Sequence, residues 1–154
     1  MSLVATSFST PGSLRQEVVV DGRFRLATDE PARLGGADSA PSPHELLPAA
    51  IAACVSTTIL MYAKTKGWEL GGVEAEVDYD PHATPRTCAI VVRTGRPVDA
   101  SRLSRIAKVA ATCPVRRALE GSVVFTERVE PATASRPVLR PVQAASQMST
   151  PILR

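Results

Sequence analysis

Three cysteines are the residues of this chain best suited to catalytic chemistry. Cys54 lies in the middle of the longest apolar run, "PHELLPAAIAACVSTTILMYAKTKGW" at residues 43–68. Cys88 lies in an extended apolar segment, and Cys113 directly precedes Pro114. A cysteine is either a small apolar packing group or, as a thiolate, a strong nucleophile, and its surroundings decide which.

Two of these thiols are explained by packing alone. Cys88 alternates with Ile90 and Val92, as expected for the inward face of a strand. Cys54 lies in an apolar helical run, and free cysteine is among the most buried residue types.

Cys113 has different surroundings, because Pro114 favours the start of a new helical turn. Backbone N–H groups at a helix start favour a thiolate, and Arg116 and Arg117 follow within one turn. On spacing alone, Cys113 is the better candidate for a reactive thiol, and Cys54 the weaker one.

The composition limits the classes of function. The 154 residues suit one domain, with 44% hydrophobic and 21% charged residues. The net charge of +3 comes from scattered arginines rather than a basic block, which argues against nucleic-acid binding. The chain has no CxxC or HExxH motif and its two histidines are isolated, so we expect no metal and no other cofactor.

No secretory signal is visible in residues 1–13, so we expect a cytoplasmic protein whose thiols are free. The apolar run predicts a core helix rather than a membrane span, because Pro48 and several hydroxyl side chains interrupt it and two lysines follow it. Ser42, Pro43 and Glu45 are typical of a helix start, and Gly67 of a helix end, so the helix should cover residues 43–66.

The remaining elements follow from turn signals and periodicity. Asp21-Gly22 predicts a β-hairpin within residues 14–30. The other predictions are strands at 71–80, 86–95 and 122–130, a helix at 98–113 and a helical turn at 114–121. Residues 1–13 are expected to form a flexible N-terminus, 14–130 a single domain, and 131–154 a disordered tail or, alternatively, a basic interaction tail.

This order of elements predicts an α+β fold, with a mainly antiparallel sheet and the helices on one of its faces. The helix at residues 43–66 is apolar nearly all round, so one thin sheet cannot cover it. We therefore expect it to be buried on every side or covered by a second copy of the chain.

Two motifs carry a resemblance to a known family. "SPHELLPAAIAACVSTTILMYAKTKGW", followed about sixty residues later by "CPVRRALEG", resembles the OsmC/Ohr family of thiol-dependent peroxidases. The preceding "DEPARLGGADSAPSPHELL" is similar to the general OsmC-like branch, and the resemblance covers residues 14–130. It implies an OsmC-like fold with curved antiparallel sheets, two central helices and an intertwined homodimer whose active site lies at the subunit interface.

The resemblance also implies roles for the thiols. Cys54 would be the peroxidatic nucleophile that attacks an organic hydroperoxide, and hydrogen peroxide less well. Cys113 would condense with the resulting sulfenic acid to form a disulfide, which an external dithiol then reduces.

One departure from the family pattern concerns the support of the thiolate. The peroxidase branches carry a glutamate ten residues before the first cysteine, paired with an arginine. That position is His44 here, and the neighbouring acid is Glu45. The arginine should come from the N-terminal hairpin, where Arg23 and Arg25 are both candidates.

Two other readings remain open. The chain could be a non-peroxidatic family member that binds a small hydrophobic ligand or an electrophile, which the change to His44 favours. It could also be a structural protein whose thiols only pack. For the peroxidase hypothesis the expected partners are a second copy of the chain, an organic hydroperoxide and a dithiol, with no nucleic acid and no membrane.

Overall fold

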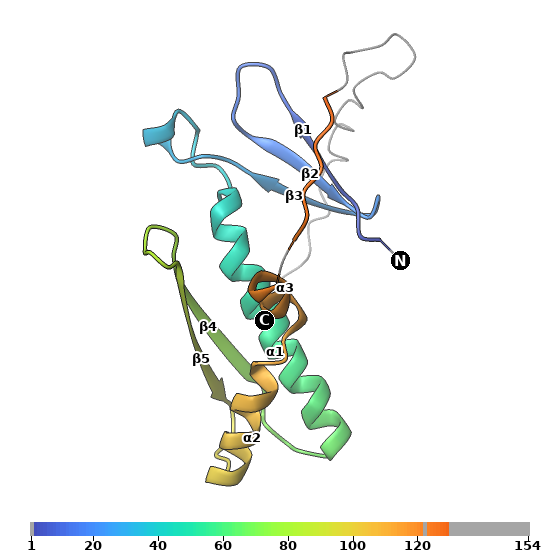
Figure 1. Cartoon of the computed structure of the whole chain (residues 1–154), viewed down its shortest axis with the longest axis vertical. Coiled ribbons are helices and arrows are strands. Elements are labelled where there is room, and N and C mark those ends of the chain that lie inside the picture. Colours follow the sequence, from blue (N-terminus) through green and yellow to red (C-terminus); the bar gives the residue numbers. More distant parts are fainter. Residues whose placement is uncertain (1, 122, 130–154) are drawn as a thin grey trace, which may run out of the picture. The chain divides into compact units, whose positions relative to one another are not determined.

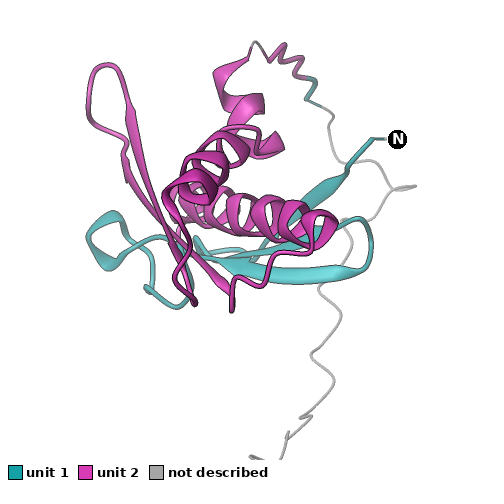
Figure 2. Ribbon diagram, turned by 90° about the horizontal axis from the view of Figure 1, so that it is seen from below, with its two compact units in different colours: residues 1–41, 128–154 teal, residues 42–127 magenta. Residues whose placement is uncertain are grey.

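The computed structural model describes residues 2–121 and 123–129 and confirms the α+β class (Figure 1). The chain divides into two compact units (Figure 2). We call residues 1–41 with 128–154 the hairpin unit, and residues 42–127 the helix unit. The tail expected at 131–154 lies outside the described residues.

The hairpin unit contains a three-stranded antiparallel sheet in the order β1-β2-β3. β2 (Gln16–Val20) and β3 (Phe24–Thr28) form the predicted hairpin, with Val18 opposite Leu26. The backbones of Asp21 and Gly22 both have positive φ, which is why this dipeptide suits the turn. β1 (Ala5–Ser9) pairs with β2, so the first residues contribute a strand that the sequence interpretation did not include.

A buried carboxylate organises the loop that follows β3. Asp29 is only 1% exposed, and it accepts hydrogen bonds from the N–H groups of Glu30, Ala37 and Ser39 and from the Ser39 hydroxyl at 2.7 Å. The Ser39 hydroxyl bond, with these N–H donors, outweighs burial and holds the pKa of Asp29 below its ordinary value. The loop includes a short 3-10 helix, η1 (Ala32–Leu34), and Gly36, where a side chain would collide with the Glu30 carbonyl.

The helix unit is built around α1 (Pro43–Lys66), which has the bounds expected from the sequence. The Glu45 carboxylate accepts hydrogen bonds from the Ser42 backbone N–H at 2.7 Å and from its hydroxyl at 2.9 Å. Gly67 ends the helix in the left-handed conformation. Pro48 lies within the helix.

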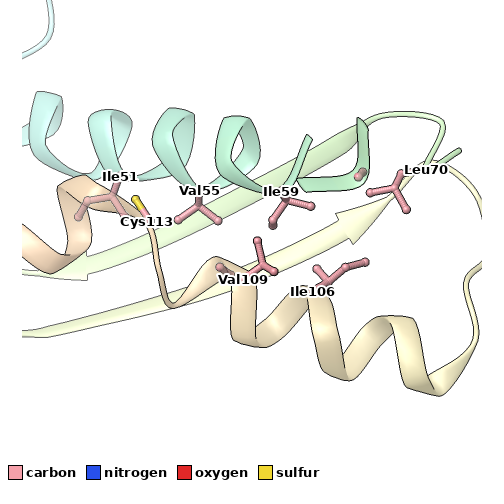
Figure 3. Close-up of a cluster of buried hydrophobic side chains, with 9 residues drawn as sticks. Ile51, Val55, Ile59, Leu70, Ile106, Val109 and Cys113 are labelled. Atoms are coloured by element: carbon pink, nitrogen blue, oxygen red, sulfur yellow. The ribbon is translucent and has the colours of Figure 1, made fainter. Parts of the chain in front are cut away.

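One face of α1 forms the core of the helix unit. Ile51, Val55, Ile59 and Ala63 recur every four residues and are all buried. Figure 3 shows Ile51, Val55 and Ile59 pointing from α1 toward the α2 side of the cluster, where Ile106 and Val109 lie.

Much of the rest of α1 is exposed, so the helix is not buried on every side. Leu60 is 45% exposed and Met61 is 67% exposed. By length and composition alone α1 could cross a membrane, but its packed face makes it a core helix in this structure. Its covering by a second copy of the chain stays a prediction.

The other elements of the helix unit pack against this face. β4 (Val73–Asp80) and β5 (Thr87–Thr94) form an antiparallel pair, with Val77 opposite Ile90. α2 (Ala100–Ala110) begins at Asp99, whose carboxylate accepts the Arg102 N–H at 2.9 Å, and α3 (Pro114–Glu120) follows Cys113. These four elements were predicted, because alternation and capping signals in the sequence are strong.

The prediction of a strand at residues 122–130 is wrong for the part that the structure describes. Residues 123–129 have no regular secondary structure, and Val124, Phe125 and Val129 are exposed. A strand requires a neighbouring strand to satisfy its backbone groups, and among the described elements β4 and β5 pair only with each other. The β-branched composition predicted a strand but could not provide this neighbour.

We predict that Ile59→Ala lowers the free energy of unfolding by about 2–5 kcal/mol, because it leaves a cavity in the packed face of α1. Lys64→Ala, at an exposed polar position of the same helix, is the control and should change it by less than about 1 kcal/mol. Urea denaturation of both variants checks this. Equal losses in the two variants would contradict the assignment of Ile59 to the core.

We predict that Asp29→Asn destabilises the protein at neutral pH, because the amide replaces a charged acceptor of four hydrogen bonds. The folded-state pKa of Asp29 is depressed, so its contribution is present above the unfolded pKa and is lost as the pH falls through the folded value. The difference in stability between wild type and variant should therefore shrink in acid. Urea midpoints across the acidic range measure it, and a constant difference would contradict the assignment.

Candidate active site

The helix unit brings Cys54 and Cys113 together from segments far apart in the sequence. Cys54 precedes Val55 on α1, is half-buried and packs against the core cluster. Cys113 is 0% exposed and lies at the junction where α2 ends and α3 begins. The Cys113 N–H donates to the Ala110 carbonyl at 3.2 Å, as part of the turn that joins α2 to α3.

The two thiols are hydrogen-bonded to each other, and the surroundings favour the thiolate of Cys54. Burial raises the pKa of Cys54, but hydrogen bonds from the Cys113 thiol, the Val115 N–H and the Thr58 hydroxyl outweigh burial. The pKa of Cys54 therefore lies below its ordinary value. The Thr58 hydroxyl also lies 2.7 Å from the Cys54 carbonyl oxygen, so its single proton serves one of these acceptors at a time.

The opposite shift occurs at Cys113. Burial raises the pKa of Cys113, and its hydrogen bond to the Cys54 sulfur and the charge of that sulfur raise it further. The N–H groups of Arg116 and Val115 act in the other direction and are outweighed. Residue spacing alone favoured Cys113 as the reactive thiol. In the structure, Cys54 is the more acidic of the two thiols, and Cys113 is its hydrogen-bond donor.

The structure places His44 and Glu45 in the first turn of α1, away from the thiols. Both residues are exposed, and Glu45 caps the helix through Ser42. His44 precedes Cys54 by ten residues, which is about 15 Å along a helix. Within the helix unit, these two residues and the thiols therefore do not form one cluster.

The two candidate arginines belong to the hairpin unit. Arg25 on β3 forms an ion pair with Glu17, and Arg23 pairs with Asp21 at 3.0 Å and lies over the Phe24 ring. Both arginines therefore have local partners, and a role for either at the thiolate stays a prediction.

A cavity of about 720 Å³ opens within the helix unit. Its walls come from α1, the β4–β5 pair and α3: Leu47, Ile51, Tyr79, Arg86, Thr87, Cys88, Ile90, Arg116, Leu119 and Glu120. Ile51 lies one helical turn before Cys54, and the Arg116 N–H lies beside Cys113. The cavity has the size of a small-molecule site, and residues close to Cys54 and Cys113 in sequence line it, although neither sulfur of the pair does.

Two side chains of this cavity differ from the sequence-based expectation. Cys88 is exposed rather than packed, because it lies at the start of β5, next to the loop at residues 81–86, and not among the residues packed on the core. Arg116 does not approach a thiolate with its guanidinium; its Nε pairs with Glu120 at 2.7 Å. Only its backbone N–H reaches a sulfur.

Sequence reasoning missed the Val115 N–H and the Thr58 hydroxyl as groups that contact Cys54. The spacing of Thr58, four residues after Cys54 on a helix, was a usable signal. No sequence pattern could indicate Val115, because its backbone N–H, and not its side chain, donates the hydrogen bond to Cys54. Among the described residues, no group of three or more His, Cys, Asp or Glu is arranged to hold a metal ion.

Comparisons with known proteins agree on one fold. A structure of a Psychrobacter arcticus 273-4 protein named for osmotic stress induction and detoxification response is 26% identical, with a TM-score of 0.63, covering 74% of this chain and 85% of that one. An organic hydroperoxide resistance protein from Legionella pneumophila is 22% identical, with a TM-score of 0.59, covering 79% and 90%. An OsmC-like protein from Mycoplasma pneumoniae is 18% identical, with a TM-score of 0.64, covering 79% and 89%.

A search of curated proteins finds no match. The family model described as OsmC-like protein matches residues 36–128, which include the whole of α1 and both Cys54 and Cys113. The resemblance that the two cysteine motifs indicated is thereby confirmed. The chain belongs to the OsmC-like protein family.

Proposed function

We propose that this protein is a thiol-dependent peroxidase that reduces organic hydroperoxides, and hydrogen peroxide less well. The observation that carries the proposal is the Cys54–Cys113 pair, in which hydrogen bonding favours the thiolate on one sulfur and burial keeps the proton on the other. The name of the Legionella pneumophila relative, organic hydroperoxide resistance protein, supports the substrate class.

The first step is attack of the Cys54 thiolate on one oxygen of the hydroperoxide. An S–O bond forms, the O–O bond breaks, and Cys54 becomes a sulfenic acid while the organic alkoxide leaves. The alkoxide takes a proton and departs as an alcohol. Cys113 already donates a hydrogen bond at this point, so it is placed to supply that proton.

The second step joins the two sulfurs. The Cys113 thiolate left by that proton transfer attacks the sulfur of the Cys54 sulfenic acid, an S–S bond forms and the S–O bond breaks, and the departing hydroxide takes a proton from solvent and leaves as water. An external dithiol then reduces the disulfide through a mixed disulfide and is itself oxidised. The hydrogen bond between the two thiols supports this step, because it places the sulfurs next to each other before oxidation.

Three further parts of the proposal are taken from the resemblance to the OsmC/Ohr family. The protein would act as a homodimer, in which a second copy covers the exposed face of α1 around Leu60 and Met61. Arg23 or Arg25 would support the thiolate, with His44 or Glu45 in place of the family's glutamate. A reducing cytoplasm would keep the thiols free between turnovers.

A second candidate function is binding of a small hydrophobic ligand or an electrophile without peroxide chemistry. It is favoured by the cavity, whose lining includes the exposed Cys88 but neither sulfur of the pair. In that case Cys88 would be the thiol that meets an incoming electrophile.

We predict that Cys54→Ser abolishes consumption of cumene hydroperoxide in the presence of a dithiol, because the nucleophile is lost. Cys113→Ser should still form a sulfenic acid, detectable with a dimedone probe, but no internal disulfide. Cys88→Ser is the control and should keep turnover, since Cys88 is not part of the pair. Wild type that leaves peroxide and thiols unchanged would refute the peroxidase and favour the second candidate.

We predict that Thr58→Val slows alkylation of Cys54 by iodoacetamide several-fold at neutral pH. The variant loses a hydroxyl donor, so the pKa of Cys54 rises and less thiolate is present. Ser56→Ala is the matched control, because Ser56 donates to the Ala52 carbonyl at 2.9 Å on the same helix. Mass spectrometry of the Cys54 peptide across pH measures the rate, and an unchanged profile in Thr58→Val would contradict this role.

A further inference from the structure

A second, smaller pocket lies at the opposite end of α1 from His44 and Glu45. It has a volume of about 420 Å³ and lies between the end of α1 and the exposed side of α2. We call it the cationic pocket; it is lined by Tyr62, Lys66, Trp68, Ser101, Ser104, Arg105 and Lys108. Nothing in the peroxidase proposal uses it.

The α2 contribution to the cationic pocket is a single stripe of donors. Ser101, Ser104, Arg105 and Lys108 have the spacing i, i+3, i+4 and i+7, which puts them on one helix face. The opposite face holds Ile106, Val109 and Ala110 in the core. Packing of the apolar face therefore directs two hydroxyls and two cations to the pocket side.

The positive charge of the pocket is not neutralised by acidic side chains. In the part of the chain that the structure describes, Arg105 and Lys108 have no carboxylate partner. The Lys66 ammonium lies 5.8 Å from the centre of the Tyr62 ring, and this cation–π contact brings no opposing charge to the lysine.

The carboxylates nearest in sequence are occupied elsewhere. Asp99 pairs with Arg102 at 3.4 Å, and Glu69 lies 3.8 Å from Arg96. Neither acid lines the pocket, and Arg102 stays over the Trp68 ring at 5.3 Å. Lys66, Arg105 and Lys108 therefore line a pocket that no carboxylate among the described residues lines.

The wall opposite α2 is aromatic. Tyr62 and Trp68 meet edge to face with their ring centroids 5.5 Å apart, and both are half-buried. Two packed rings form this wall of the pocket, and the exposed cations lie around it.

We propose that the cationic pocket binds a small phosphate-bearing anion, such as pyrophosphate or the diphosphate of a nucleotide. Phosphate oxygens only accept hydrogen bonds, and the lining offers the planar donors of Arg105, two lysine ammonium groups and two hydroxyls. Arginine suits phosphate through paired parallel N–H donors, and lysine as a point charge.

The cationic pocket is separate from the thiols. Lys66 follows Cys54 by twelve residues, which is about 18 Å along α1. Binding at the pocket therefore does not depend on peroxidase activity, and a failed peroxide assay would leave this proposal standing.

The chain contains a single tryptophan, Trp68, so its fluorescence reports on this pocket directly. We would titrate the full-length protein with pyrophosphate, ADP and adenosine at low ionic strength, following Trp68 emission and the heat of binding. We expect saturable binding of pyrophosphate and ADP, weakened by salt, and none of adenosine.

The test variant is Arg105→Gln/Lys108→Gln. Its affinity for pyrophosphate and ADP should fall at least about tenfold, because it loses two charge-assisted hydrogen bonds to the phosphate oxygens. Arg33→Gln/Lys64→Gln is the matched control, because it removes the same charge from exposed positions outside the pocket and should bind like wild type. Circular dichroism and thermal melting check that both variants fold.

Three results would overturn the proposal. These are the absence of binding of either phosphate compound by wild type, equal loss in both double variants, or binding of adenosine as tight as that of ADP. Co-sedimentation with phosphatidylcholine vesicles, with and without phosphatidate, separates a lipid headgroup from a free anion. Binding to phosphatidate vesicles without binding of pyrophosphate would replace the small ligand by a membrane lipid.

Discussion

The packed face of α1 is the interaction on which the rest of the helix unit depends. Ile51, Val55, Ile59 and Ala63 form one continuous stripe, against which β4, α2 and α3 are arranged. Since aromatic residues make up only 4% of the chain, the buried core consists of aliphatic side chains and Cys113, and such small side chains must pack closely to fill it. Each of the two pockets lies where another element meets this helix.

The same packing explains why two chemically identical thiols behave differently. Cys54 precedes the fully buried Val55, so its sulfur lies at the edge of the core, where donors from the start of α3 reach it. Cys113 lies inside the core and its charged form is disfavoured by burial. A nucleophile needs its thiolate and a resolving thiol can remain protonated until the first step, so this asymmetry suits a two-cysteine cycle.

α1 also separates two kinds of environment. The larger cavity, beside the first half of the helix, combines aliphatic walls with Tyr79, Cys88 and the Arg116–Glu120 pair. The cationic pocket at the other end combines two aromatic rings with unneutralised cations. The two pockets thus lie toward opposite ends of α1 and have different linings.

By itself, the sequence determined the features that depend on neighbours along the chain. Ser42, Glu45 and Gly67 set the bounds of α1, Asp21-Gly22 set the hairpin turn, and the two cysteine motifs indicated the family. Caps, turns and short motifs act over a few residues, so their physical causes are readable from spacing.

Only the tertiary structure decided the features that depend on partners distant in sequence. It made Cys54 rather than Cys113 the more acidic thiol, exposed Cys88, paired β1 with β2, and left residues 123–129 without the strand that their composition favoured. Burial, strand pairing and the direction of a backbone N–H are set by which elements meet. For that reason, motifs that singled out both Cys54 and Cys113 could not tell which of the two thiols has the lower pKa.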